Sequence, residues 1–317
     1  MRKIGLDLGY GGIKVYEPGK ETMLASFIGT VNEYSEPSAE TAIVKFNGIT
    51  LMVGRDVFFA GTEQPSLSPD RWLGSNEALA AFYAGVGAHL KGNKPKESLS
   101  LYVGLPASLT TVDVRAETQA KVSRWLAGEH NWDYNGKRIS ATVDSVVVRS
   151  QASGAIFDLI HTVNGDFSKD IDYLDRGVGI ASIGFNTVEL SGGINGRPAS
   201  AMMLSSADGV QALLQQCAIN KRAGIAHLDD QLRKGALGES YEAYRKRWAG
   251  SIVSLMETKW RSLLDSLQRI MVVGGGVQHA EPELKARFGE RLYIPSSPIF
   301  SVARGLYKMA VVDGKTA

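Results

Sequence analysis

The stretch MRKIGLDLGYGGIK (residues 1–14) decides the fold of this chain. Its apolar start predicts a strand that ends at Asp7, and Lys14 follows a glycine-rich turn. The turn contains Gly9, Tyr10, Gly11 and Gly12. Glycine has no Cβ, so such a turn lets the backbone approach a phosphate and offer its N–H groups to the anion. Asp7 can then hold a metal ion through water while Lys14 balances the phosphate charge.

A second unit of the same kind is expected half a chain later. Residues 179–184 predict a strand that ends in small residues, and residues 188–190 predict its return. The turn between them includes Gly184, Phe185, Asn186 and Thr187. Two such units that face each other across a cleft would clamp a polyphosphate from both sides.

A third element is a run of three glycines after an apolar strand. Residues 269–273 predict that strand, and residues 282–288 predict a helix beyond the run. The run consists of Gly274, Gly275 and Gly276. Backbone without side chains can lie against a flat adenine ring or a ribose. Three glycine units in this order therefore favour a nucleotide-binding cleft over three unrelated tight turns.

Composition limits the remaining possibilities. The 317 residues favour two lobes, and a hydrophobic content of 44% predicts a full core. The net charge of +2 gives no indication of direct nucleic-acid binding, so the basic run at residues 245–247 is expected to be a solvated helix face. The single cysteine, Cys217, excludes an intramolecular disulfide and a cysteine-rich zinc site, and we expect it in the core.

Localisation follows from the absence of a long apolar stretch. No part of the sequence approaches the roughly 18 to 20 apolar residues that span a bilayer. The chain is expected to be cytoplasmic and to have no membrane partner.

The order of elements predicts where the lobes divide. Residues 1–164 are expected to form the first lobe, with a small inserted subdomain at about residues 29–69. Residues 165–317 are expected to form the second lobe, with an inserted helical region at about residues 205–250. A closing helix at residues 302–311 can pack back on the first lobe.

Taken together, these segments resemble the actin, sugar kinase and DnaK-type chaperone ATPase superfamily. The resemblance implies a two-lobed α/β fold of duplicated ribonuclease H-like domains with small inserted subdomains. Within the superfamily, the chain looks most like the prokaryotic ParM/StbA-type plasmid segregation actins and the archaeal actin-like proteins. Five segments match the family's nucleotide elements in order, namely residues 7–14, 151–154, 182–187, 273–276 and 302–305.

The resemblance also implies roles for single residues. Asp7 would hold the hydration shell of Mg²⁺, Lys14 would contact the β- and γ-phosphates of ATP, with GTP as the alternative, and Gln151 would orient the attacking water. The three glycines at residues 274–276 would contact the adenosine. Phosphoryl transfer depends on charge neutralisation and an aligned water, and a glutamine does not readily take a proton, so we expect slow hydrolysis.

One position departs from the family pattern. The second phosphate loop usually begins with an aspartate, and this chain has Ser182 there. A serine can hydrogen-bond a water but supplies no charge. Three explanations remain open: hydrolysis is slow, another acid such as Glu189 compensates, or the serine traps one nucleotide state.

The leading functional hypothesis is a polymerising ATPase for plasmid segregation. The resemblance implies self-assembly into filaments and a DNA-binding adaptor of the ParR type, so that plasmid DNA is contacted only indirectly. One alternative is a small-molecule kinase, for which Asp113 is the best candidate base, although a helix N-cap is its more ordinary role. Another is a nucleotide-binding regulator that does not polymerise. Weak candidates for ribose and base contacts are Lys221, Arg222 and Glu257.

Overall fold

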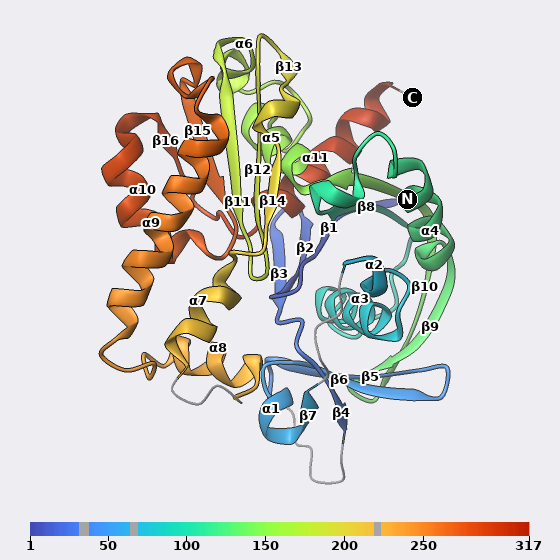
Figure 1. The fold of residues 1–317 in the computed structure, drawn as a ribbon. Coiled ribbons are helices and arrows are strands. Elements are labelled where there is room, and N and C mark those ends of the chain that lie inside the picture. Colours follow the sequence, from blue (N-terminus) through green and yellow to red (C-terminus); the bar gives the residue numbers. More distant parts are fainter. Residues whose placement is uncertain (32–37, 64–68, 219–222, 317) are drawn as a thin grey trace.

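The computed structural model describes residues 1–31, 38–63, 69–218 and 223–316. Within these ranges it contains two β-sheets, with α5 (Gln151–Ile160) and α11 (Ser301–Thr316) packed between them (Figure 1). The remaining helices are α1 (Val57–Ala60), α2 (Pro69–Trp72), α3 (Asn76–His89), α4 (Arg115–Leu126), α6 (Tyr173–Arg176), α7 (Val210–Cys217), α8 (Ile225–Arg233), α9 (Tyr241–Trp260) and α10 (Val277–Phe288). We call the first sheet with α1 to α4 the first lobe, and the second sheet with α6 to α10 the second lobe.

The first sheet has ten strands among the described residues, in the order β3-β2-β1-β8-β10-β9-β5-β6-β4-β7. Their bounds are β1 (Arg2–Leu8), β2 (Ile13–Glu17), β3 (Lys20–Leu24), β4 (Ile28–Val31), β5 (Thr41–Phe46), β6 (Ile49–Gly54), β7 (Gly61–Glu63), β8 (Leu99–Leu105), β9 (Gly128–Tyr134) and β10 (Lys137–Ser150). The strands β4 to β7 do not form a sheet of their own. They continue the main sheet because β5 pairs with β9.

The second sheet repeats the first part of this order. It runs β13-β12-β11-β15-β16, with β14 paired to β12. The bounds are β11 (Val178–Ile183), β12 (Val188–Ile194), β13 (Arg197–Pro198), β14 (Leu204–Ser206), β15 (Arg269–Val273) and β16 (Leu292–Tyr293). In both sheets, the first strand of an antiparallel hairpin also pairs with a parallel strand. In the first sheet β1 pairs with β2 and with β8, and in the second sheet β11 pairs with β12 and with β15. This duplication confirms the expected fold class.

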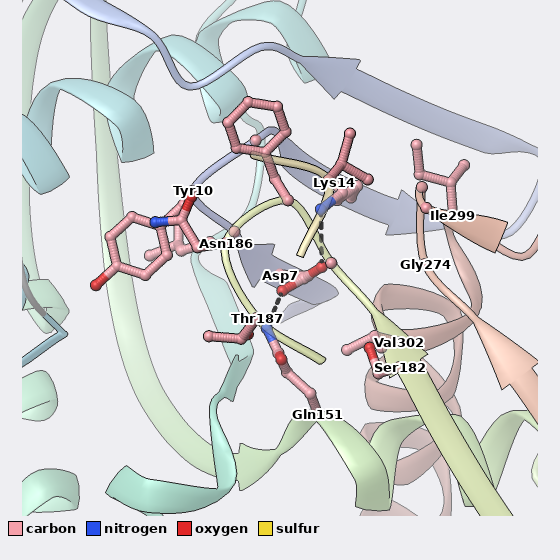
Figure 2. A pocket seen from close by; sticks show the side chains of 18 of the residues that line it. Asp7, Tyr10, Lys14, Gln151, Ser182, Asn186, Thr187, Gly274, Ile299 and Val302 are labelled. Atoms are coloured by element: carbon pink, nitrogen blue, oxygen red, sulfur yellow. Dashed lines mark hydrogen bonds and ion pairs between the residues drawn. The ribbon is translucent and has the colours of Figure 1, made fainter. Parts of the chain in front are cut away.

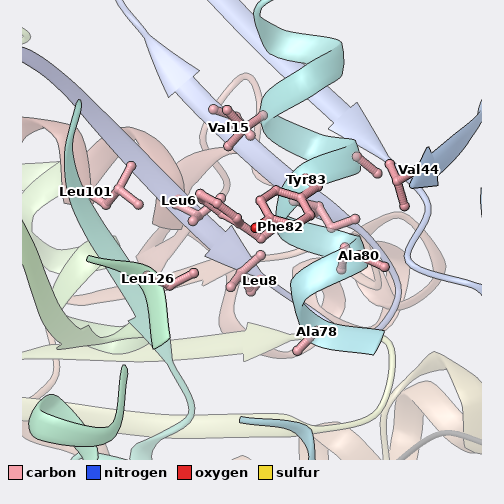
Figure 3. Packing of buried hydrophobic residues seen from close by; sticks show 14 of the residues in the cluster. Leu6, Leu8, Val15, Val44, Ala78, Ala80, Phe82, Tyr83, Leu101 and Leu126 are labelled. Carbon is pink, nitrogen blue, oxygen red and sulfur yellow. The ribbon is translucent and has the colours of Figure 1, made fainter. Parts of the chain in front are cut away.

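The core of the first lobe forms where α3 crosses the sheet. Ser75 caps this helix by accepting a hydrogen bond from the backbone N–H of Ala78 at 3.1 Å. Phe82 and Tyr83 then pack toward Leu6 and Leu8 of β1 (Figure 3). Both faces of β1 are covered, by α3 on one side and α11 on the other, which explains the continuous apolar run in its sequence. The long strands β9 and β10 curve around α3 (Figure 1).

The two lobes are joined through α5 and α11. The side chain of Asp158 on α5 is only 4% exposed, and its carboxylate accepts hydrogen bonds from Ser301, Arg304 and Lys308 of α11 at 2.6 to 2.8 Å. Burial alone would raise the pKa of Asp158, but the two cations outweigh it and lower the pKa. A Cβ built at Gly305 would lie 1.7 Å from the carbonyl oxygen of Gly154, so glycine is required where the helices touch. Among the residues described, no helix combines the length and apolarity needed to cross a membrane.

Candidate functional site

The first glycine turn places an acid and a lysine side by side. Asp7 on β1 stands opposite Lys14 on β2 in the antiparallel register, so both side chains lie on the same face of the sheet. Lys14 Nζ is 3.2 Å from Asp7 Oδ2, and both side chains are largely buried. The turn is held by a bond from Gly12 N–H to Gly9 C=O, which also accepts the Ser26 hydroxyl at 2.6 Å.

Gln151 reaches the same acid from another segment. It is the first residue of α5, which Ser150 caps by accepting the backbone N–H of Ser153. The side-chain amide of Gln151 donates to Asp7 Oδ1 at 3.0 Å. Lys14 and Gln151 therefore approach Asp7 from opposite sides (Figure 2).

The second glycine turn lies opposite the first. Gly184 N–H donates to Thr187 C=O at 2.8 Å and closes the turn between β11 and β12. The start of α7 supports it, because the backbone N–H of Gln211 donates to Phe185 C=O at 2.8 Å. Asn186 Oδ1 is buried and has no hydrogen-bond partner within the described ranges. A buried acceptor of this kind fits a site that binds a ligand or an ordered water.

Ser182 precedes this turn and faces Glu189 across the β11–β12 pair. Glu189 is buried and does not line the pocket described below. It accepts the Ser205 hydroxyl at 2.6 Å and the backbone N–H of Ala107 from the first lobe at 3.2 Å. Burial raises the pKa of Glu189, although these hydrogen bonds oppose the shift. The Glu189 carboxylate thus links the lobes next to Ser182. It is already hydrogen-bonded to Ser205 and Ala107.

The three glycines after β15 form a third wall. Gly274 has a φ of +99°, a conformation that favours glycine, and its N–H donates to Pro298 C=O. A Cβ at Gly276 would lie 2.4 Å from Ile183 Cγ2, so this strand end packs directly on the end of β11. A Cβ built at the adjacent Gly275 would lie 3.4 Å from Ile299 Cδ1.

These segments enclose a pocket of about 580 Å³. It is lined by Asp7, Gly9, Tyr10, Gly11, Lys14, Gln151, Ser182, Gly184, Phe185, Asn186, Thr187, Gly274, Gly275 and Gly276, so that Gly12 is the one predicted site residue outside the lining. Tyr10 and Asn186 lie at one end, Gly274 and Ile299 lie at the other, and Asp7 lies between them (Figure 2). The glycine units therefore converge on one cavity.

Sequence reasoning missed several side chains in this cavity. They include Arg55, Trp72, Asp229, Arg233, Gln278 and His279. Arg55 and Arg233 resemble ordinary surface charges in the sequence, and no short motif indicates that they face a pocket. Burial, with the nearby charge of Arg245, lowers the pKa of His279 to about 4, so the imidazole is neutral at pH 7.

Other candidates lie elsewhere. Asp113 is exposed and does not line the pocket, and it is not an N-cap either, because Val114 precedes α4 without a side-chain cap. Glu257 does not line the pocket but pairs with Arg287 on the surface of α9. Lys221 and Arg222 lie outside the described residues.

The basic run at residues 245–247 is not uniformly solvated, contrary to expectation. Arg245 is buried and makes an ion pair with Glu283 at 2.7 Å, whereas Lys246 and Arg247 are exposed. Cys217 is buried, as expected.

A divalent metal would have little protein ligation here. Among the described residues, no group of three or more His, Cys, Asp or Glu side chains could hold a metal ion. Asp7 is the one acid among the predicted residues that line the cavity. This donor set fits Mg²⁺, which keeps several waters and binds through one or two carboxylates together with phosphate oxygens.

Comparisons with known proteins agree with this geometry. Residues 5–154 match the family model of the actin like proteins N terminal domain. The chain has an actin-like fold, near that of the ParM-type proteins.

Three solved structures illustrate this likeness, each 18% identical to the chain. The apo pSK41 ParM protein covers 99% of this chain and 98% of its own, with a TM-score of 0.73. Ta0583, an archaeal actin homologue in complex with ADP, covers 98% and 99%, also with a TM-score of 0.73. A ParM in a 15-stranded filament from Clostridium botulinum covers 100% of both chains with a TM-score of 0.75. No curated protein sequence matches the chain.

Proposed function

We propose that this protein is a ParM-like ATPase that binds Mg·ATP in the pocket, assembles into filaments and hydrolyses the nucleotide. The observation that carries the proposal is the meeting of Asp7, Lys14 and Gln151 between two glycine turns. The three residues come from β1, β2 and the start of α5, and all of them line this pocket. Their distances suit a polyphosphate site, where charge and positioning dominate catalysis.

Each residue has a distinct part in the proposed reaction. The backbone N–H groups of the two turns bind the phosphates, and Lys14 moves from Asp7 to the phosphate oxygens. Asp7 would hold a hydrated Mg²⁺, and that ion would supply charge neutralisation on the phosphates. Gln151, already 3.0 Å from Asp7, orients the attacking water through its amide. The glycines at residues 274–276 receive the nucleoside.

Assembly and partners belong to the same proposal. A ParM from Clostridium botulinum and the protein Alp12 form filaments, which supports self-association of this chain. A head-to-tail interface that does not close on itself produces such filaments. We propose that the filament segregates plasmid DNA in the cytoplasm through a DNA-binding adaptor of the ParR type, without direct DNA contact by this chain.

The same fold could also serve a small-molecule kinase or a nucleotide-binding regulator. A small-molecule kinase requires a base beside the acceptor, and Asp113 cannot serve because it is exposed and outside the pocket. A nucleotide-binding regulator that neither polymerises nor turns over is favoured by one observation. Ser182 supplies no charge at the position where an acid is expected.

Light scattering after addition of Mg·ATP, with electron microscopy of the same sample, tests the proposal. We expect filaments with Mg·ATP and phosphate release that follows assembly, and no filaments with Mg·ADP. Nucleotide binding without scattering or phosphate release would favour the regulator. ADP release that depends on an added acceptor would favour a kinase. The same measurements with Mg·GTP determine whether the protein prefers an adenine or a guanine nucleotide.

A further inference from the structure

Phe185, at the tip of the second glycine turn, touches both lobes. A Cβ built at Gly11 would lie 2.3 Å from Phe185 Cβ, so the two turns are in direct contact at this point. The Phe185 ring also packs edge to face against Phe27 of the first lobe, with centroids 5.6 Å apart and an interplanar angle of 69°. Such pairs are favourable beyond the area they bury.

Phe27 belongs to a small apolar cluster separate from the cores of the lobes. This roof cluster consists of Ala25, Phe27, Met52, Val57 and Ala226, with Phe58, Ile225 and Phe185 packed against it. Ala226 and Ile225 come from α8 of the second lobe, and α8 contacts α1 of the first lobe (Figure 1). The roof cluster is therefore an apolar contact between the lobes, in addition to the one that α5 and α11 make.

Charged residues extend this contact along the pocket. Glu40 of the first lobe binds Arg55 at 2.7 Å and lies 3.8 Å from Arg233 of α8. Both arginines line the pocket. His227 of α8 packs against Phe58 with ring centroids 5.1 Å apart. Opening the pocket on this side would separate Glu40 from Arg233 and Phe58 from His227.

The backbone of the second turn is rigidly held, so the Phe185 side chain moves with it. The turn is closed by the Gly184 to Thr187 bond and fixed to the first turns of α7 through the Phe185 carbonyl. A phosphate bound by this turn would thus fix the position of the ring against Gly11 and Phe27.

We propose that Phe185 is a positioning residue that couples occupation of the phosphate turns to closure of the roof cluster, and so controls how fast nucleotide leaves. The inference rests on the proposed nucleotide binding. In the closed arrangement Phe185 joins the two turns to the roof. Without its ring, the roof and the phosphates are no longer linked, and the lobes open more often with nucleotide bound.

Stopped-flow fluorescence with mant-ATP and Mg²⁺ tests this coupling on the full chain. We expect Phe185→Ala to raise the dissociation rate on the order of tenfold while leaving the association rate nearly unchanged. Phe27→Ala should have a similar effect, and the double variant should be no faster than either single one, because both remove the same link. Phe185→Leu, which keeps the apolar bulk, should be intermediate and serves if the alanine variant unfolds. Phe167→Ala is the matched control, since this exposed phenylalanine does not line the pocket.

The outcomes separate the coupling from the proposed function. Dissociation of mant-ATP from Phe185→Ala at the unchanged rate would overturn the coupling alone, as would fully additive effects of the two alanine variants. Failure of the unsubstituted protein to bind mant-ATP would overturn the proposed function itself. Hydrogen exchange at residues 51–58 and 225–233 gives a second readout. Nucleotide should slow exchange there in the unsubstituted protein but much less in Phe185→Ala.

Discussion

Ser182 and Glu189 stand directly opposite each other on β11 and β12, with both side chains on the same face of the sheet. Ser182 lines the pocket, whereas Glu189 is bound to Ser205 and to Ala107 of the first lobe. At position 182, where an acid is expected, the chain therefore has a neutral side chain. This side chain lies next to a buried carboxyl that already joins the lobes. Glu189 does not take its place within the pocket lining.

Ser182→Asp is expected to speed phosphate release by about tenfold, because it adds a charge that helps to order the metal and the attacking water. The same change should lower the melting temperature without nucleotide, since the new carboxylate lies beside Glu189. Phosphate release and thermal unfolding measure the two effects. Ser182→Asn is the uncharged control. An unchanged release rate would show that the missing acid has no effect on turnover.

Asp7→Ala is expected to abolish nucleotide-dependent assembly. The substitution removes the proposed metal-holding carboxylate and leaves Lys14 and Gln151 without their common partner. Light scattering with Mg·ATP checks this result, and Asp113→Ala is the matched control because Asp113 is exposed outside the pocket. Normal assembly of Asp7→Ala would refute the metal role.

Gln151→Ala is expected to slow phosphate release at least tenfold while filaments still form, because the amide orients water rather than binding the nucleotide. The filaments should then persist longer after a fixed amount of ATP. Scattering decay and phosphate release in the same sample provide the measurement. Loss of assembly together with loss of release would instead indicate that Gln151 supports the pocket through Asp7.

Gly305→Ala is expected to destabilise the protein by about 3 kcal/mol or more, since its Cβ would overlap the Gly154 carbonyl at the contact of α5 and α11. Gly250→Ala is the control. Outside its own helix, no described residue comes within 4 Å of a Cβ built at Gly250 in α9, so alanine should stabilise that helix by roughly 0.5–1 kcal/mol. Urea unfolding distinguishes the two. Equal changes in the free energy of unfolding for the two variants would contradict the close contact between α5 and α11 at Gly305.

Lowering the pH is expected to remove the contribution that the ionised Glu17 carboxylate makes to the free energy of unfolding. Burial alone would raise the pKa of Glu17, but hydrogen bonds from Arg2 and His89 outweigh it and lower the pKa from 4.5 to about 2. A lowered carboxyl pKa gives stability that is present above the unfolded value and lost as the pH falls toward the folded value. The difference in unfolding free energy between the unsubstituted protein and Glu17→Gln should therefore shrink between about pH 5 and about pH 3. A constant difference would refute the assignment.

The elements with strong local patterns were predictable. The strand expected at residues 269–273 has those bounds, and the helix expected at residues 302–311 lies within α11. The pairing of β5 with β9, which joins the inserted strands to the main sheet, depends on residues about 90 positions apart and has no local signal. The helix α8, which lies within the helical region expected at about residues 205–250, was not predicted as a separate helix because it is short.

The site was predictable where glycine geometry is required, as at Gly11 and Gly274. It was not predictable where ordinary charges such as Arg55 and Arg233 reach the pocket through tertiary packing. The burial of Arg245 was hidden for the same reason, because its partner Glu283 lies on another helix. The division of the lobes at residue 164 and the roles of single site residues stay predictions.

The position of α11 has a consequence for how the protein matures. This helix covers β1, β2 and β8, strands formed from the first third of the sequence, and supplies the partners of Asp158. Until residues beyond 300 leave the ribosome, one face of the first sheet is therefore bare and Asp158 is an unpaired acid. The pocket can take its final shape only after synthesis has passed this helix, long after the strands that carry Asp7 and Lys14 have been made.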